Sequence, residues 1–315
     1  MDKKVVVIGG GHGQSLICRA IKTIENLDIS AIVTVADDGG STGRLRRQFQ
    51  IPAMGDIRNV LVSLAENETV MSDLMNYRFA DPEGTQDDIH GHNLGNLILT
   101  ALTQQTGSFL EAIQTAGEIL NVKGTIIPAT TEVITLYARM EDGVIVKGEA
   151  NIPTLNNHIQ TVFYDREVKA DPDAVQAILQ ADLIIYGIGS VYTSILPNVI
   201  IPEIREALNR SQGRKIYMCN VMTQPGETDG YSVEDHVEAL LKHGAPVDAV
   251  VVANDIIPEE IREKYLQTRS TPVILQQSAH NYRIITHSLL RFNEGLIRHD
   301  VAKLRETIKD LLNEE

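Results

Sequence analysis

A glycine-rich junction after the first apolar run constrains the fold of this chain more than any other feature. Residues 4–8 form a short, almost unbroken apolar run, which is typical of a strand buried on both faces. Residues 14–24 then place apolar side chains at helical spacing. The residues at the turn, all predicted to contact a ligand, are Gly9, Gly10, Gly11, His12 and Gly13. Glycines let the backbone approach a ligand closely, and a helix start favours phosphate, so the junction predicts a Rossmann-like α/β fold that binds a nucleotide or phosphate.

The spacing of these glycines differs from that of the common dinucleotide motif. The pattern G-x-G-x-x-G needs its third glycine one residue later than Gly13. The chain also lacks G-x-x-x-x-G-K-[ST], which argues against a P-loop ATPase or GTPase. Because a glycine cluster also occurs as a purely structural turn, this motif alone leaves both interpretations open.

A second polar loop follows the next apolar run, at residues 31–36, and begins with Asp37 and Asp38. An acidic residue at this place binds a ribose hydroxyl in Rossmann proteins. Two adjacent carboxylates are also suited to hold Mg²⁺. The remaining alternative is an Asx turn, in which the aspartates accept hydrogen bonds from nearby backbone N–H groups.

Three arginines in the same loop stand out because the chain carries a formal net charge of −14. Arg44, Arg46 and Arg47 follow Gly43 closely, and guanidinium groups recognise phosphate through paired hydrogen bonds. We therefore predict that Gly43 and Arg44 contact the ligand. A solvated helix face is the alternative, above all for Arg47.

A third loop follows the apolar run at residues 183–186, which predicts another buried strand. Its predicted ligand contacts are Gly187, Gly189, Ser190 and Thr193. Taken with the segments at 55–59, 91–96 and 220–228, the loops resemble the 2-phospho-L-lactate transferase (CofD)-like family. They are most similar to its bacterial branch, the gluconeogenesis factors, over roughly residues 5–298.

The resemblance implies a Rossmann-like three-layer fold with a cleft for a phosphorylated, nucleotide-like ligand. The bacterial branch is associated with growth on gluconeogenic carbon sources, with cell shape and with binding of uridine diphosphate sugars. The archaeal branch uses Mg²⁺ to transfer a phospholactyl group to a deazaflavin alcohol. The loop at 187–190, with Thr193 and Ser194, matches the bacterial form, which argues against the archaeal substrate but leaves phosphotransfer to another acceptor open.

Several residues between these loops lie on the family motifs or beside them. The further predicted ligand contacts are Asn93, Asn96, Asn220 and Arg298. His92 and Asn93 stand where a loop meets a predicted helix, so a structural cap is the alternative to a ligand contact. His90 and His92, with Asp87 and Asp88 upstream, lack the further ligands at the spacing that zinc requires. Arg298 is expected near a second phosphate or a sugar, and the alternative is a surface ion pair.

Length and patterning allow one large α/β domain or two closely joined ones, and we predict one mainly parallel, doubly wound α/β domain over residues 1–315. An antiparallel hairpin insertion is expected at about residues 132–149, further strands at 249–253 and 273–276, and an amphipathic helix at about 300–313. That helix is expected to pack on the body or on a second subunit, and a homo-oligomer is expected.

The net charge and the two cysteines indicate where in the cell the protein is expected and which binding partners are unlikely. Cys18 and Cys219 lack zinc spacing and are expected to lie in the core, in a reducing cytoplasm. No signal peptide precedes the first strand, and no apolar stretch approaches the ~20 residues that span a bilayer. The acidic balance argues against a nucleic-acid partner.

Two functions follow from these residues. One is a regulatory protein that binds a nucleotide or nucleotide sugar. The other is a Mg²⁺-dependent transferase, in which Asp37 or Asp38 holds the metal and Asp56 or His92, the two catalytic candidates, positions the acceptor. An NAD-binding protein is a further alternative, because the first two loops resemble a nicotinamide site.

Overall fold

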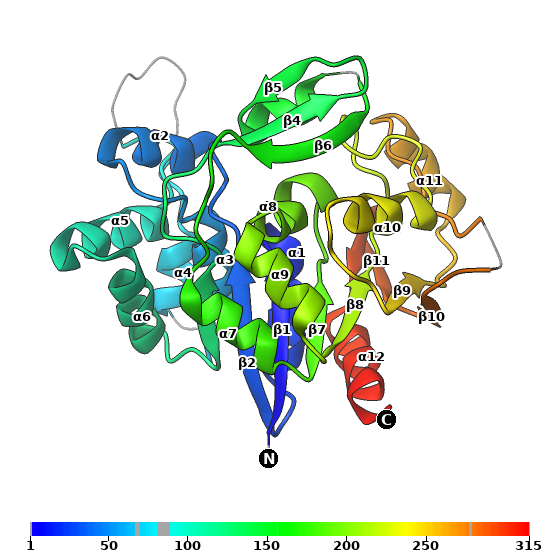
Figure 1. The fold of residues 1–315 in the computed structure, drawn as a ribbon, viewed down its shortest axis with the longest axis horizontal. Helices are drawn as coiled ribbons and strands as arrows, with labels where there is room; N and C mark the ends of the chain where they lie inside the picture. Colours follow the sequence, from blue (N-terminus) through cyan, green and yellow to red (C-terminus); the bar gives the residue numbers. More distant parts are fainter. Residues whose placement is uncertain (1, 67–69, 81–88, 156, 277–278, 315) are drawn as a thin grey trace.

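A seven-stranded sheet forms the centre of the protein (Figure 1). The computed structural model describes residues 2–66, 70–80, 89–155, 157–276 and 279–314. Every pairing in the sheet is parallel, and the order is β10-β9-β8-β7-β1-β2-β3. The strands are β1 (Lys3–Gly9), β2 (Leu27–Val33), β3 (Thr125–Pro128), β7 (Leu183–Tyr186), β8 (Arg214–Met218), β9 (Ala249–Ala253) and β10 (Arg283–His287).

The strand order reverses between β1 and β7. From β1 the chain builds outward to β2 and β3, whereas β7 pairs with the other side of β1 and begins the second half of the sheet. Ligands of open α/β sheets bind beyond the carboxyl ends of the strands at such a reversal. The predicted doubly wound sheet is therefore confirmed, and its reversal lies at the strands that carry the glycine loops.

Helices cover both faces of the sheet, which completes the three layers that were predicted. On one face α1 (Gly11–Ile21) packs against α3 (Gly55–Leu64) and α12 (Val301–Asn313). On the face toward the viewer in Figure 1 lie α7 (Pro172–Gln180), α8 (Leu196–Val199) and α9 (Pro202–Arg210). The other helices are α2 (Gly40–Phe49), α4 (Val70–Asn76), α5 (Leu94–Thr106), α6 (Phe109–Ile119), α10 (Val233–Lys242) and α11 (Glu259–Leu266).

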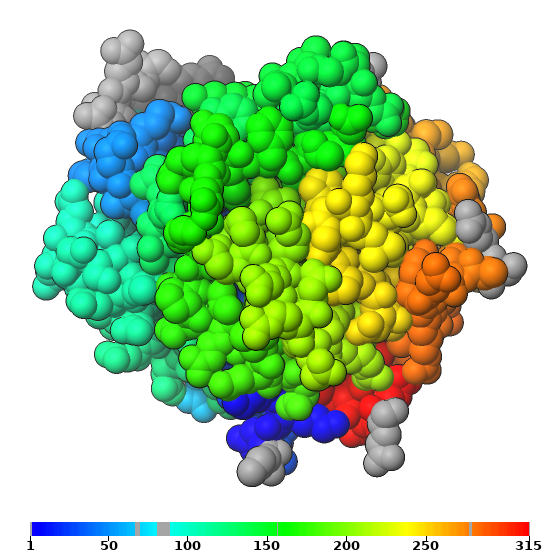
Figure 2. All heavy atoms as spheres, viewed as in Figure 1, coloured from blue at the N-terminus to red at the C-terminus, as the bar shows by residue number. Residues whose placement is uncertain are grey.

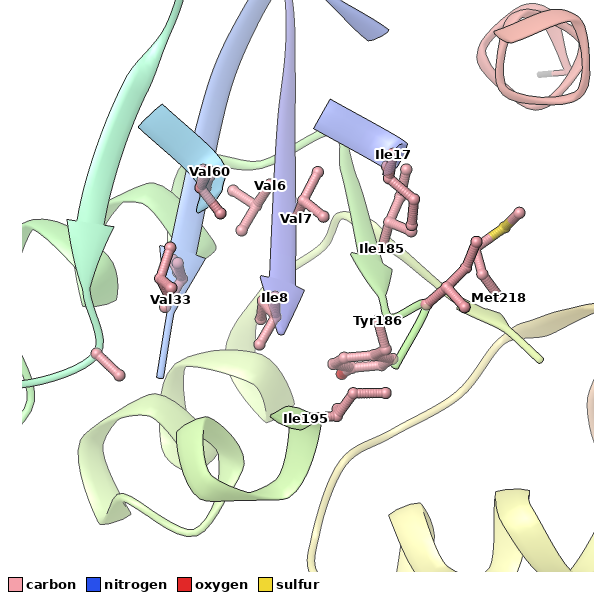
Figure 3. Close-up of a cluster of buried hydrophobic side chains, with 14 of the residues drawn as sticks. Val6, Val7, Ile8, Ile17, Val33, Val60, Ile185, Tyr186, Ile195 and Met218 are labelled. Atoms are coloured by element: carbon pink, nitrogen blue, oxygen red, sulfur yellow. The ribbon is translucent and has the colours of Figure 1, made fainter. Parts of the chain in front are cut away.

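Buried aliphatic side chains surround β1 where it lies between its two neighbours (Figure 3). Val7, Ile8, Ile17 and Ile185 are fully buried there, and the ring of Tyr186 packs among them. Burying one such aliphatic side chain contributes about 1.5–3 kcal/mol, so this region holds the strand ends in fixed positions.

An antiparallel sheet stands above the carboxyl ends of the central strands (Figure 1). It consists of β4 (Leu136–Met140), β5 (Ile145–Lys147) and β6 (Ile159–Tyr164), in the order β5-β4-β6. The predicted hairpin turns at Asp142 and Gly143, whose φ of +87° suits glycine. The hairpin is therefore confirmed, and β6 adds a third strand. A 3₁₀ turn, η1 (Glu149–Thr154), lies between β5 and β6, and residues 136–164 are called the insertion below.

The C-terminal segment differs in part from its prediction. The strand predicted at 273–276 is wrong, because only an isolated bridge joins Met222 to Pro272 there. Proline supplies no N–H to a ladder, and β10 forms the sheet edge instead. The predicted terminal helix is confirmed as α12, which packs on α1.

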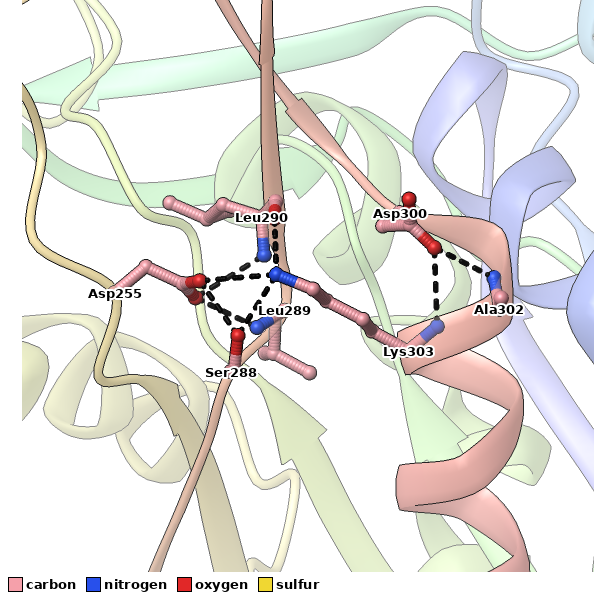
Figure 4. Close-up of polar contacts among 7 residues, drawn as sticks. All are labelled: Asp255, Ser288, Leu289, Leu290, Asp300, Ala302 and Lys303. Carbon is pink, nitrogen blue, oxygen red and sulfur yellow. Dashed lines mark hydrogen bonds and ion pairs between the residues drawn. The ribbon is translucent and has the colours of Figure 1, made fainter.

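A polar cluster holds this segment together (Figure 4). Asp255 accepts hydrogen bonds from Ser288 Oγ at 2.7 Å and from the N–H groups of Leu289 and Leu290, and it pairs with Lys303 Nζ at 3.3 Å. Asp300 caps α12, after the ribbon of β11 (Leu290–Asn293) and β12 (Leu296–His299). None of the described helices combines the length and the apolar character that crossing a membrane requires.

Candidate functional site

The first and third loops touch each other at the carboxyl ends of β1 and β7. A Cβ atom on Gly13, in the first turn of α1, would lie 2.1 Å from the carbonyl oxygen of Ile188. Asn198 adds a second connection, since its side-chain amide donates to the carbonyl of Gly9 at 3.1 Å. The structure therefore brings together the two loops, at 9–13 and 187–190, that the sequence predicted to share a ligand.

Asp56 lies against the glycine turn. A Cβ atom on Gly10 would lie 2.5 Å from Asp56 Oδ2 and 2.6 Å from Thr34 Cγ2, so only glycine fits there. The backbone N–H of Gly11, which has a φ of +63°, donates to the carboxylate of Asp56. Asp56 thus faces the N-terminus of α1, where a phosphate was expected.

The environment of Asp56 makes its carboxyl group a weaker acid than that of an ordinary aspartate. Burial, and then the nearby charge of Asp37, raise the pKa of Asp56 to about 7, although the hydrogen bond from Gly11 opposes them. A carboxyl group with such a pKa is able to take up or release a proton near neutral pH. This property suits the catalytic role predicted for Asp56.

Asp37 and Asp38 point in different directions. Asp37 Oδ1 accepts from the N–H of Gly39 at 2.9 Å, the Asx turn that was one alternative. Asp38 Oδ1 accepts from the N–H of Ala150 at 2.9 Å and so ties the β2 loop to the insertion. Among the described residues, no three Asp, Glu, His or Cys side chains are grouped as a metal site. A magnesium ion held by this pair stays a prediction.

Two glutamates that sequence reasoning missed complete the group of acids. Burial, and after it the charges of Asp37, Asp56, Glu227 and Asp38 in that order, raise the pKa of Glu149 to about 9. Glu149 comes from η1 of the insertion, whereas Glu227 follows β8. No local sequence motif identifies Glu149 as a site residue, but Glu227 lies in the 220–228 segment that carried the family resemblance.

The third loop uses its hydroxyl groups internally. Ser190 Oγ donates to the buried Glu227, and Thr193 Oγ1 donates to the same carboxylate at 3.3 Å. Asn220 Oδ1 accepts from the N–H of Gly189 at 3.4 Å. Burial raises the pKa of Glu227, although the two hydroxyl groups oppose this. Gly187 and Gly189 have φ values of +89° and +151°, a backbone conformation that favours glycine.

The arginines of the second loop have protein partners. Arg44 donates to the carbonyl of His90 at 2.8 Å, and the buried Arg46 donates to the carbonyls of Asp37 and Ile134. Arg47 is exposed. Beside them a cavity of about 590 Å³ lies between α2 and the insertion, with Arg47, Lys147 and Asp38 in its wall.

His92, Asn93 and Asn96 belong to a buried network that supports α2. His92 Nδ1 lies 3.0 Å from Ser41 Oγ, and Asn96 Nδ2 donates to Thr42 Oγ1 at 3.3 Å. Asn93 caps α5 by accepting from the N–H of Asn96 at 3.1 Å. The structural cap that was the alternative for Asn93 is therefore present, and Asn96 positions the second loop.

The last two predicted contacts lie on the surface. His12 is exposed in the first turn of α1, directly beside the glycine turn. Arg298 is exposed on β12, opposite Arg291 in the ribbon, and no ion pair of the described residues includes it. The surface pair that was the alternative for Arg298 is thus not seen, and its contact to a ligand stays a prediction.

Comparison with known proteins supports the family resemblance. A family model described as 2-phospho-L-lactate transferase CofD matches residues 5–290. The chain belongs to the CofD family. Within it, the "Gluconeogenesis factor" of Bacillus subtilis (strain 168) is 43% identical over 317 residues, which cover 99% of this chain and 98% of that protein. A "Putative gluconeogenesis factor" of Thermotoga maritima is 41% identical and covers 97% of this chain and 98% of its own length.

Solved structures agree with the fold of this CofD family member. The crystal structure of a member of the UPF0052 family from Bacillus halodurans has a TM-score of 0.92 and 42% sequence identity. The match covers 98% of this chain and 99% of that one. The seven-stranded parallel sheet and its antiparallel insertion therefore belong to a fold already seen in crystals.

Proposed function

We propose that this CofD family member is a gluconeogenesis factor that binds a nucleotide sugar, with a uridine diphosphate sugar as the expected ligand. The contact between the first and third loops at the strand-order reversal carries the proposal, because ligands of open α/β sheets bind at such a reversal and the N-terminus of a helix, here α1, favours phosphate. The relatives named gluconeogenesis factor, which match almost the whole chain, support the same function.

The negative charge at the site leads us to expect that Mg²⁺ binds together with the diphosphate. Asp37, and Asp56 once it has lost its proton, would repel a diphosphate, and a divalent cation between the carboxylates and the phosphate oxygens removes that repulsion. Mg²⁺ commonly binds through one or two carboxylates together with substrate phosphates and water. We therefore propose that the ligand binds as its magnesium complex and that the cavity beside Asp38, which has a suitable volume for a ligand, receives part of it.

Calorimetric titration of uridine diphosphate sugars, with Mg²⁺ and with a chelator, tests the proposal. We expect binding that Mg²⁺ strengthens and that Gly11→Val abolishes, because a β-branched residue resists the φ of +63° and its methyl groups would block the approach to the backbone. Gly107→Val is the matched control, since Gly107 ends α5 at a φ of +72° with nothing within 4 Å of an added Cβ. A folded Gly11→Val protein with unchanged affinity would contradict the proposed binding mode.

A transferase is the second candidate function, favoured by the pKa of Asp56 and by the name of the family model. In this function Asp56 accepts the proton of an alcohol whose oxygen attacks the phosphorus that carries the sugar; the P–O bond to the nucleotide breaks, and the nucleoside monophosphate leaves. The loops hold the phosphates, because phosphoryl transfer depends mainly on positioning and on charge stabilisation. Incubation of the nucleotide sugar with Mg²⁺ and a set of alcohols, followed by ³¹P NMR, distinguishes the two. New phosphodiester signals that Asp56→Asn removes indicate transfer, and an unchanged spectrum indicates a binding protein.

The cellular role is proposed on the same basis. In a strain that lacks the protein, the wild-type chain should restore growth on gluconeogenic carbon sources and normal cell shape, whereas Gly11→Val should not. Restoration by the Gly11→Val chain would separate that role from ligand binding. A cytoplasmic location and a homo-oligomer stay predictions, which cell fractionation and light scattering test directly.

A further inference from the structure

A second cavity, of about 400 Å³, lies between the insertion and the main domain. Its wall is formed by β4 and β6 of the insertion, by α9 and by the end of α10, and it shares no lining residue with the cavity beside Asp38. The green insertion, the yellow-green helix α9 and the yellow helix α10 belong to segments that meet on the face shown in Figure 2.

Positive charge gathers around this cavity in a chain of net charge −14. Arg139, Arg205 and Lys242 reach it from three different elements, and no ion pair of the described residues includes any of them. The one acid in the wall, Glu167, already pairs with Lys169. The dipole of α10 explains Lys242 in its last turn, but it does not explain the two arginines.

Contacts other than ion pairs position both arginines. The side chain of Arg205 lies across Gly244, where a Cβ atom would be only 2.6 Å from Arg205 Cδ. The guanidinium of Arg139 stands over the ring of Phe163, 5.9 Å from its centroid. Both side chains are exposed and pass over these neighbours, and no ion pair of the described residues occupies their N–H groups.

The floor of the cavity is fixed and neutral. His243 Nε2 accepts from the N–H of Val162 at 3.0 Å, which leaves Nδ1 to donate to the carbonyl of Ala239 at 2.7 Å. Burial lowers the pKa of His243, so this arrangement persists at neutral pH. It ties α10 to β6, and Tyr164 fastens the same strand to Pro197 by a hydrogen bond of 2.7 Å.

We propose that this cavity binds a small organic phosphate carrying at least two negative charges. Guanidinium and ammonium groups supply the charge-assisted hydrogen bonds that phosphate favours. Val168 and Ile200 provide an apolar wall for the carbon part, and the volume fits a compact molecule such as a sugar phosphate. The site is independent of the loops at the carboxyl ends of β1 and β7.

Calorimetric titration with ribose 5-phosphate and with inorganic pyrophosphate, both in a chelator, tests the proposal. We expect both to bind the wild-type protein, and the double variant Arg205→Ala/Lys242→Ala to lower their affinity by at least about tenfold. The matched control Arg291→Ala/Lys264→Ala removes the same charge from exposed positions and should leave the affinity within about twofold.

A third variant separates this site from the proposed nucleotide-sugar site. Gly11→Val should keep the affinity for ribose 5-phosphate, because the glycine turn contributes nothing to this cavity. Equal affinities in the wild-type and Arg205→Ala/Lys242→Ala proteins, or the absence of binding to the wild type, would overturn the proposal. Loss of binding only in Gly11→Val would assign the phosphate to the loops and equally overturn it.

Discussion

Replacing Asp56 by asparagine measures how much a charged carboxylate beside the glycine turn lowers the free energy of unfolding. The native protein holds the pKa of Asp56 at about 7, against 3.8 for the ordinary carboxyl group. At about 1.4 kcal/mol for each pKa unit, this difference corresponds to about 4 kcal/mol of native-state destabilisation above pH 7. Asp56 is only partly buried, and solvent screening reduces the expected effect to about 2 kcal/mol.

The sign of the pH dependence follows from proton binding. Between pH 4 and pH 7 the native protein keeps the Asp56 proton that the unfolded chain has lost, so this group lowers stability progressively as pH rises. Asparagine has nearly the same shape, and its side-chain oxygen still accepts from the N–H of Gly11. Asp56→Asn should therefore stabilise the protein little at pH 4.5 and by about 2 kcal/mol at pH 8.

Urea denaturation at both pH values, without Mg²⁺, measures this difference. Asp28→Asn is the control, because it removes a carboxylate of the same type from an exposed position on β2. Its effect on the free energy of unfolding should be small. A stability difference between Asp56→Asn and wild type that is equal at pH 4.5 and pH 8 would refute the reasoning.

Three further predictions concern the contacts that surround the site. Gly13→Ala should lower the free energy of unfolding by about 1–3 kcal/mol, because its Cβ meets the backbone of Ile188; Gly117→Ala, a helical glycine whose Cβ has room, should not destabilise in the same urea experiment. Asp255→Ala should cost about 2–4 kcal/mol, because the N–H groups of the buried Leu289 and Leu290 lose their acceptor and Lys303 loses its carboxylate; a loss below 1 kcal/mol in thermal unfolding would contradict this. Arg298→Ala should weaken nucleotide-sugar binding about tenfold in calorimetry while the melting temperature stays unchanged, and unchanged affinity would remove Arg298 from the site.

The loops of the site were predictable because the backbone itself demands their residues. Gly10 and Gly13 have no room for a side chain, and Asp37 caps its own turn, so each leaves a local signature after an apolar run. Glu149 leaves none, since it reaches the site only when the insertion folds over the sheet. The same limit explains why His92 was a catalytic candidate, because its partner Ser41 lies 51 residues away.

The prediction of secondary structure failed where the composition of a segment disagreed with its neighbouring residues. Residues 273–276 are rich in strand-forming side chains, yet they follow Pro272 and stay outside the sheet. The true edge strand, β10, alternates exposed and buried positions and begins with a charged residue, a weak signal over five residues. Helix α2 was only the alternative for the arginines that it carries, because it begins at Gly40 and contains Gly43, residues that disfavour a helix.

The packing of α12 on α1 has a consequence for synthesis of the protein. The helix that begins at the glycine turn depends for its cover on residues 301–313, and Lys3 at the start of β1 donates to the carbonyl of Leu312. During translation the part of α1 that α12 covers therefore stays open to solvent until residues 301–313 have been synthesised and packed. A nascent chain that stops before them would present this surface to chaperones.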